Sequence, residues 1–142
     1  IYGPHDKYDL DKSHVFGATI TKVMRATDTL EVWGSGKEIR DFLYADDLVD
    51  FIKTAIRKQK SQYEIYNCGS GEPITVKELC EKIIKLSGKD IKIQFNKAKP
   101  TIPFNMFLNT AKAKKELGWS PKTKIDNGVI KTLKWWKNNV KK

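Results

Sequence analysis

Two histidines are the clearest candidates for proton transfer in this 142-residue chain, because the sequence contains no others. His14 lies directly before an apolar segment of helical periodicity, and an imidazole there could donate or accept a proton near neutral pH. A capping histidine without a catalytic role is the alternative. His5 lies in a polar, turn-like segment and is assigned no role. No carboxylate or thiol spacing accompanies the pair, so no metal site is predicted.

Arg40 is the clearest candidate for binding an anion. The chain has 27 basic residues, and only Arg25, Arg40 and Arg57 are arginines. Arg40 follows a Gly34-Ser35-Gly36 turn, in which glycine lets the backbone approach a ligand closely. Its planar guanidinium can bind a pair of phosphate oxygens, whereas the alternative is a surface ion pair with Asp41. We therefore expect Arg40 to contact a diphosphate.

The net charge of +10 is compatible with either a nucleic-acid surface or a field that attracts a nucleotide diphosphate. The lysines are scattered rather than clustered, so a solvated basic surface is favoured and no nucleic-acid partner is predicted. No apolar run is long enough to span a membrane, and the start of the chain is unlike a signal peptide. We expect a cytoplasmic protein in which Cys68 and Cys80 are buried, reduced thiols.

Hydrophobic periodicity and turn residues predict an α/β fold in which short strands alternate with helices. A capping box of Thr75 and Glu78 is the strongest helix signal, and Gly88 suits the end of that helix. A Gly-rich turn predicts a hairpin-like pair. The predicted elements in the first half are a helix over 13–26 capped by Ser13, paired strands at 30–33 and 39–44, a helix from 46 with an apolar stripe, and a strand at 63–68. In the second half they are a helix over 75–88, a strand at 91–95, a short helix capped by Thr110 and ending at Leu117-Gly118, and a last helix from 126 that buries Ile130, Leu133, Trp136 and Val140.

Long runs of the sequence resemble the extended short-chain dehydrogenases/reductases that act on nucleotide sugars. Residues 33–48 resemble the family pattern W-G-x-G-x-x-x-R-D-F-x-Y-x-D-D-L, and Tyr2-Gly3-Pro4 resembles its Y-G-P. Residues 66–76 and 112–121 resemble two further family runs, so the likeness covers nearly the whole chain. The resemblance implies the C-terminal, substrate-binding portion of an NAD(P)-dependent nucleotide-diphosphate-sugar epimerase, dehydratase or reductase, lacking most of the Rossmann sheet.

Within that family, Pro4-His5-Asp6 followed by Ser13-His14-Val15 is similar to the GDP-L-fucose synthase motif. This likeness implies that His14 is an acid/base residue. It also implies that Trp33, Arg40, Lys22 and Asn105 bind the substrate and that Tyr2 and Pro4 border the cofactor. Lys22 stands where that family has an arginine, and Lys99 could replace a cation that the loop over 103–110 lacks. A nucleotide-sugar 4,6-dehydratase or 4-epimerase is the alternative, and a basic nucleic-acid-binding module is the alternative from another class.

The same resemblance predicts what lies outside the chain. The chain is predicted to lack both the G-x-x-G-x-x-G dinucleotide turn and the Y-x-x-x-K catalytic pair, so that alone it would be inactive and would bind neither NAD nor NADP. Residues 1–142 are read as one domain whose unit at about 61–88 belongs with a missing N-terminal Rossmann half. We expect that half to be a partner, the whole protein to be a homo-oligomer, and the open edge of the strand at 63–68 to be covered.

Overall fold

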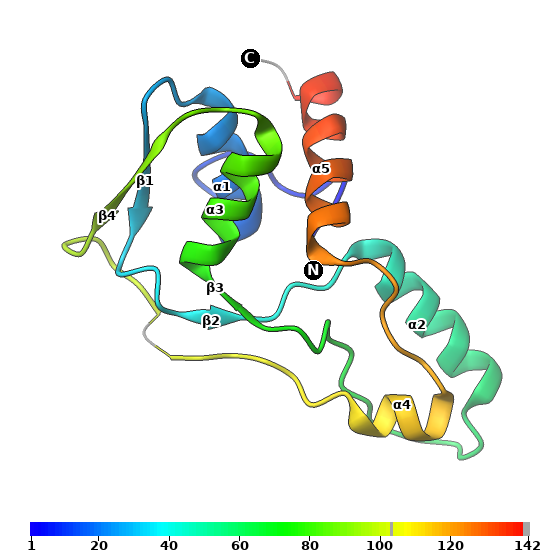
Figure 1. Cartoon of the computed structure of the whole chain (residues 1–142). Helices are drawn as coiled ribbons and strands as arrows, with labels where there is room; N and C mark the ends of the chain where they lie inside the picture. The colour runs from blue at the N-terminus through cyan, green and yellow to red at the C-terminus, as the bar shows by residue number, and fades with distance from the viewer. Residues whose placement is uncertain (103, 141–142) are drawn as a thin grey trace.

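The computed structural model describes residues 1–102 and 104–140, in which helices and short strands alternate (Figure 1). The α/β prediction is thereby confirmed. Among the described residues, every helix is too short or too polar to cross a bilayer. The elements are α1 (Val15–Arg25), β1 (Thr29–Trp33), β2 (Ile39–Arg40), α2 (Ala45–Lys58), β3 (Ile74–Thr75), α3 (Val76–Ser87), β4 (Lys92–Asn96), α4 (Ala111–Leu117) and α5 (Ile125–Asn139).

The strands form two separate pairs rather than the predicted hairpin. β1 pairs in parallel with β4, from Thr29 opposite Lys92 to Trp33 opposite Asn96. β2 pairs antiparallel with β3 instead of with β1. The hairpin prediction is wrong because the chain does not reverse at the glycine turn: Phe95 fills the space beside Gly36, where a Cβ would lie 2.4 Å from its ring. A parallel pair needs a long crossover, which residues 34–91 supply.

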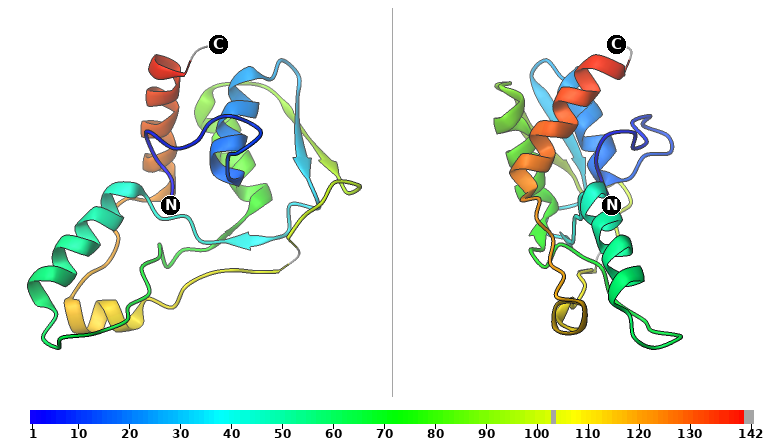
Figure 2. Two further views of the ribbon diagram at one scale, coloured as in Figure 1. Left: turned by 180° about the vertical axis from the view of Figure 1, so that it is seen from behind. Right: turned by 90° about the vertical axis from the view of Figure 1, so that its right-hand side faces the viewer.

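The larger core joins α1, α3 and α5 to one face of the β1–β4 pair (Figures 1 and 2). Its helical residues recur every three or four positions, as expected for helices that bury one stripe. The most deeply buried of them are Ile20, Val23, Leu79, Cys80, Ile83 and Val129. Tyr2 also belongs to this core: its ring stacks on Phe16 at 4.0 Å and lies against Gly128 of α5.

A smaller core lies between α2 and α4, at the end of the molecule remote from the β1–β4 pair (Figure 1). Leu43, Leu117 and Trp119 form its centre. The buried carboxylate of Asp47, in the first turn of α2, accepts hydrogen bonds from the backbone N–H groups of Lys122 and Thr123 at 3.1 and 3.0 Å. These bonds fasten the segment between α4 and α5 to α2.

The helix ends confirm some sequence predictions and correct others. The capping box of Thr75 and Glu78 is present, and both Gly88 and Gly118 end their helices in the left-handed conformation. The predicted cap Ser13 is wrong, because the N-cap of α1 is His14 and the Ser13 hydroxyl is buried without a hydrogen-bond partner in the described chain. Thr110 is the N-cap of α4, but Asn109 rather than the Thr110 side chain accepts the bond from Ala111 N.

Three predictions fail, one on a strand and two on the burial of helix side chains. Residues 63–68 form no strand, because no other described segment offers them a ladder partner. Along α2 the expected buried stripe is partly open to solvent, with Ile52 47% and Ile56 78% exposed. In α5, Ile130 is also exposed, whereas Leu133 and Trp136 are buried as predicted.

Candidate functional site

The most charged feature near the predicted site is a group of side chains around Trp33, at the C-terminal ends of β1 and β4. The Trp33 indole is 47% exposed although it ends a strand. The ammonium of Lys22, from α1, lies 5.4 Å from the indole centroid, and that of Lys99, which follows β4, lies 5.5 Å from it. Both distances are within the range of cation–π attraction. The parallel β1–β4 pairing therefore brings two cations from distant segments to one ring.

Two further side chains fix the orientation of this indole. The carboxylate of Glu31 accepts the Trp33 indole N–H at 3.3 Å and the Asn96 amide at 2.8 Å. The bond from Asn96 is the main reason that the pKa of Glu31 lies below its ordinary value, and the indole N–H and the nearby ammonium groups of Lys22 and Lys99 lower the pKa further. We refer to Lys22, Glu31, Trp33, Asn96 and Lys99 as the Trp33 cluster.

Neither lysine of the Trp33 cluster forms an ion pair with any described residue. Lys22 donates instead to the main-chain carbonyl of Glu31, at 3.2 Å. The two oxygens of the Glu31 carboxylate bond to Trp33 and Asn96. The cluster thus carries two ammonium charges against one carboxylate, so it is suited to an anion.

Arg40 does not project into open space. Its guanidinium donates to the carbonyl oxygens of Ile39, Ile102 and Phe104, at 2.8, 3.0 and 2.6 Å. These bonds engage three of its five N–H groups. Asn105 joins the same arrangement, because its side-chain oxygen accepts from Ile39 N at 3.0 Å. In this conformation Arg40 and Asn105 hold the loop after β4 against β2. Contact of either side chain with a phosphate stays a prediction.

His14 lies at the N-terminus of α1 with its side chain exposed. None of the described residues forms a side-chain hydrogen bond with it, so the imidazole is open to a ligand. Lys22 is eight residues further along the chain, or about 12 Å along a helix axis. A ligand that contacted both side chains would have to be extended, as a sugar joined to a diphosphate is.

The residues predicted to border the cofactor are mostly inside the protein. Tyr2 is 2% exposed, and its backbone N–H and C=O are bonded to Leu43 and Ala45. The Tyr2 side chain is therefore a core side chain that cannot contact a cofactor in this conformation. Pro4 is half-buried, so of these two residues only Pro4 is accessible to a cofactor in this conformation.

The prediction that the chain lacks a tyrosine with a lysine four residues on is wrong, because Tyr8 and Lys12 have this spacing. The structure gives the pair no catalytic geometry. Tyr8 is buried, its hydroxyl donates to the Gly3 carbonyl at 2.6 Å, and its ring stacks on Trp135. Burial also raises the pKa of Tyr8 far above its ordinary value, so this hydroxyl is a poor proton donor.

The acidic residues of the W-G-x-G…D-D-L run hold the backbone together. Asp41 accepts from Ser70 N at 2.7 Å and from Leu108 N at 3.3 Å, and Asp47 is bonded to two N–H groups as described above. Gly69 is required beside Asp41, since a Cβ there would lie 2.4 Å from the carboxylate. These residues are scaffold, so the specificity of the run comes from packing as much as from binding.

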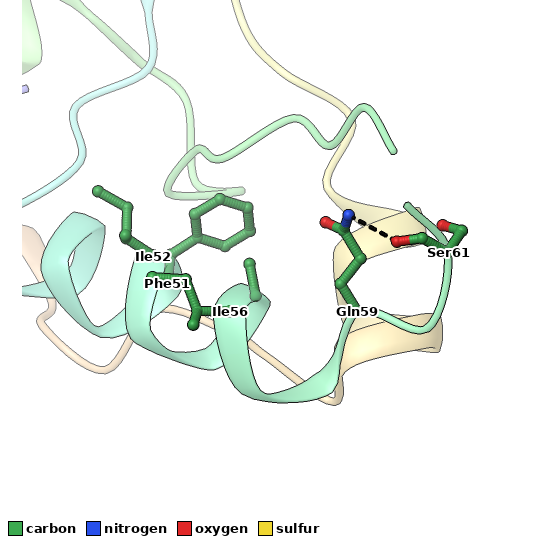
Figure 3. Close-up of a pocket in the computed structure, with 6 residues that line it drawn as sticks. Phe51, Ile52, Ile56, Gln59 and Ser61 are labelled. Carbon is green, nitrogen blue, oxygen red and sulfur yellow. Dashed lines mark hydrogen bonds between the residues drawn. The ribbon is translucent and has the colours of Figure 1, made fainter. Parts of the chain in front are cut away.

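A separate apolar surface lies along α2 and the segment after it. We call it the α2 surface, and its exposed members are Val49, Ile52, Ile56, Tyr63 and Ile65. A pocket of about 420 Å³ lies on this surface. Figure 3 shows residues that line it, among them Phe51, Ile56 and Ser61. Val49, Ile52 and Ile56 recur at helical spacing along α2, and exposed apolar side chains gathered on one helix face can mark an interaction surface.

The structure thus brings some predicted site residues together and separates others. Lys22 meets Trp33, and Arg40 and Asn105 both bind β2 to the loop after β4, whereas His14 forms no side-chain hydrogen bond with any described residue. Glu31 and Asn96 were missed. The signal that could have found them is the parallel pairing of their strands, which places Asn96 opposite Trp33 but leaves no local trace in the sequence.

Comparisons with known proteins support the sequence resemblance. Residues 1–69 match the model of the NAD dependent epimerase/dehydratase family. The chain is 34% identical to the probable GDP-L-fucose synthase 1 of Oryza sativa subsp. japonica, over 99% of this chain and 43% of that protein. It is also 34% identical to the GDP-L-colitose synthase of Yersinia pseudotuberculosis, over 97% of this chain and 46% of that protein. The chain is thus similar to the NAD dependent epimerase/dehydratase family over its first 69 residues and to these two synthases over nearly its whole length.

Solved structures agree with this assignment. The UDP-glucose 4-epimerase of Thermotoga maritima, solved with UDP-glucose, superposes with a TM-score of 0.85 at 26% identity, over 99% of this chain and 44% of that chain. The chain therefore spans less than half the length of each of these three relatives. This coverage agrees with the predicted C-terminal portion of an extended short-chain dehydrogenase/reductase.

Proposed function

We propose that this chain is the substrate-binding portion of an NAD- or NADP-dependent enzyme that epimerises and reduces a GDP-linked keto-sugar. The observation that carries the proposal is the likeness, along nearly the whole chain, to proteins named for the synthesis of GDP-L-fucose and GDP-L-colitose. Hydride transfer would depend on NAD(P) held by the other half of the protein. This chain would bind the nucleotide sugar and move one proton.

His14 is the residue that we assign to proton transfer. Its exposed imidazole lies at the end of α1 that is opposite to Lys22. A sugar ring beside His14 would place the diphosphate toward Lys22 and Trp33. Arg40 and Asn105 would form the wall of the same site by fixing the loop after β4. Pro4 would lie on the cofactor side.

The α2 surface is where we propose that the cofactor-binding half packs. It exposes apolar side chains that a stable domain would bury, and residues 63–68, which contribute Tyr63 and Ile65 to it, form no strand with any described segment. Addition of those residues to a neighbouring sheet would satisfy their backbone groups and cover the predicted open edge. Hydrogen exchange of residues 45–66 should accordingly be slower in the whole protein than in the 142-residue chain. Equal exchange rates would contradict this packing.

The alternative of a nucleic-acid-binding module has less support. Among the described residues, five lysines on several different elements form ion pairs with acidic residues: Lys77–Glu81, Lys82–Asp126, Lys112–Glu64, Lys122–Asp50 and Lys124–Glu72. Nucleic-acid binding should show a steep fall of affinity with salt. Absence of such binding at low salt would dispose of this alternative.

The experiment that tests the proposal is an assay of the whole protein with NADPH and a GDP-linked keto-sugar. We expect NADPH to be oxidised in the presence of the GDP-linked keto-sugar. The same assay with UDP- and dTDP-linked sugars separates a reductase-epimerase from a 4-epimerase or a 4,6-dehydratase. His14→Asn should lower kcat by about 10²–10⁴-fold, the usual contribution of a general acid or base.

His5→Asn is the matched control for this variant. His5 has a φ of +67°, which asparagine tolerates better than most residues, and its ring packs on Trp135. It should leave kcat near the wild-type value. Equal activity of the His14 variant and the wild type would refute the catalytic assignment, and turnover of a UDP-sugar without net NADPH oxidation would favour the 4-epimerase.

A further inference from the structure

The outward side of α5 has no part in the candidate site or in the α2 surface. Figure 1 shows α5 at one side of the molecule, and in the right-hand view of Figure 2 it lies in front of the other elements. Its inward side buries Val129, Leu133 and Trp136. The exposed residues on the opposite side recur every three or four positions, so they form one continuous face. We call it the α5 face, and its members are Asn127, Ile130, Lys131, Lys134, Lys137 and Asn138.

The α5 face is positively charged. Lys131, Lys134 and Lys137 are exposed, and none of them forms an ion pair with any described residue. The ammonium of Lys131 lies 5.1 Å from the centroid of the Tyr44 ring, which attracts it without neutralising its charge. The one acidic residue of α5, Asp126, is in the first turn and is paired with a lysine of α3. Lysines that are scattered along the sequence are thus gathered on one face by the helical repeat.

A pocket of about 290 Å³ adjoins this face where α5 begins, and it is lined by Lys122, Thr123, Asn127, Ile130 and Lys131. Ile130 is 49% exposed, although the sequence pattern predicts that it is buried. Thr123 uses its backbone N–H to bind Asp47, whereas its hydroxyl and the Asn127 amide form no hydrogen bond with any other described residue. The pocket therefore provides apolar surface and two polar side chains next to the lysines of the α5 face.

We propose that the α5 face binds an acidic, extended segment of a partner protein, with one apolar side chain of that segment in the pocket beside Ile130. Charge complementarity favours this partner, because the lysines of the face lack carboxylates of their own and attract those of another chain. From Asn127 to Asn138 the face is about 16 Å long, which about five residues of an extended chain would span. The face contains none of the residues assigned to the substrate, so this binding is independent of the proposed enzymatic function.

Two other anionic partners fit the α5 face less well. Nucleic acid is bound preferentially through arginine and through exposed aromatic rings on which bases stack, but all three arginines of the chain lie outside α5. The half-buried Trp135 of α5 already packs on His5 and Tyr8. An anionic membrane requires a broad apolar stripe that enters the bilayer interface, and Ile130 is the one apolar member of this face.

Fluorescence anisotropy of a labelled acidic peptide that contains one leucine tests the proposal on the whole protein. Lys131→Glu combined with Lys134→Glu should weaken peptide binding about 10- to 30-fold, because two attractive contacts become repulsive. Lys53→Glu combined with Lys92→Glu is the control, since these exposed lysines of α2 and β4 lie outside the α5 face and the net charge changes equally. The control should change the affinity by less than about 3-fold at physiological salt.

A milder variant guards against loss of binding through unfolding. Lys131→Gln combined with Lys134→Gln removes the two charges without adding like charges, and it should weaken binding about 3- to 10-fold at an unchanged melting temperature. Equal losses in the α5 variants and the control would overturn the proposal, because the peptide would then respond only to the overall charge. Absence of peptide binding at low salt would overturn it as well. So would tighter binding of a single-stranded oligonucleotide that the α5 variants lose, since the partner would then be nucleic acid.

The pocket needs a separate readout. The wild type should bind the leucine-containing peptide about 5-fold more tightly than the same peptide with serine in place of leucine, as expected for partial burial of one apolar side chain. Ile130→Ser should abolish this preference, whereas Lys134→Gln should weaken both peptides alike. The same preference in Ile130→Ser and in the wild type would refute the assignment of the pocket.

Discussion

Asp47 provides the sharpest test of how the scaffold is held together. Its carboxylate is 4% exposed and accepts two backbone N–H bonds, from Lys122 and Thr123. Asp47→Ala leaves both N–H groups without their acceptor. A hydrogen bond to a charged group contributes about 1.5–3 kcal/mol, so the free energy of unfolding should fall by roughly 3–5 kcal/mol.

The adjacent Asp46 is a matched control. It lies in the same first turn of α2 and is exposed. Asp46→Ala removes the same charge from the helix N-terminus and should cost about 0.3–1 kcal/mol. Asp47→Asn should fall between the two alanine variants, because its side chain keeps one acceptor oxygen but turns an N–H₂ group toward the second N–H.

Urea unfolding followed by far-UV circular dichroism measures these differences. The m-value should be the same in all variants, since the surface exposed on unfolding is unchanged. A loss in Asp47→Ala within about 0.5 kcal/mol of that in Asp46→Ala would refute the reasoning, because the buried bonds would then contribute nothing beyond the helix dipole.

Three further predictions concern stability and reactivity. Thr75→Ala should lose about 1 kcal/mol of unfolding free energy in the same urea assay, while Thr75→Ser keeps the capping box and should lose much less. Burial raises the pKa of Cys80 to about 11 from 9.0, so alkylation of Cys80 at pH 8 should be about 100-fold slower than that of an unfolded thiol, and alkylation of the half-buried Cys68 should be somewhat faster than that of Cys80. Because the pKa of Cys80 is higher in the folded state than in the unfolded state, the contribution of this thiol to stability is complete below pH 9 and is lost as the pH rises toward 11. Gly128→Ala should lower the free energy of unfolding by about 1–3 kcal/mol despite alanine's better helix propensity, because the added Cβ would lie 1.9 Å from the buried Tyr2 hydroxyl. An unchanged melting temperature would show that this core can rearrange.

Local signals predicted the helices well. The capping box at Thr75, the left-handed glycines after α3 and α4, and the apolar periodicity of α1 and α3 are each encoded within about one turn of the residues concerned. The strand pairing could not be predicted in the same way. The partners of β1 and β2 were set by tertiary packing around Phe95 and Gly36, and a glycine turn alone does not show whether the chain reverses.

The candidate site shows the same division. The guanidinium of Arg40 suits a phosphate, but the sequence gives no sign that the carbonyl groups of Ile102 and Phe104 occupy its N–H groups. The Tyr-Gly-Pro motif predicts that Tyr2 borders a cofactor, whereas the Tyr2 side chain lies in the core. The sequence suggests Lys99 only as a replacement for the cation that the loop over 103–110 lacks. The structure places its ammonium over the Trp33 ring, because β1 and β4 end side by side.

The parallel pairing of β1 with β4 has a consequence for how the protein acquires its site. Trp33 and Lys99 meet only after the intervening residues 34–91 have been traversed and both strands have aligned. Contacts so distant along the chain pay a loop-closure entropy before they gain any energy, and they tend to form late during folding. The lysine-bearing end of the ladder should therefore mature among the last parts of the domain, so that anion affinity reports complete folding rather than partial collapse.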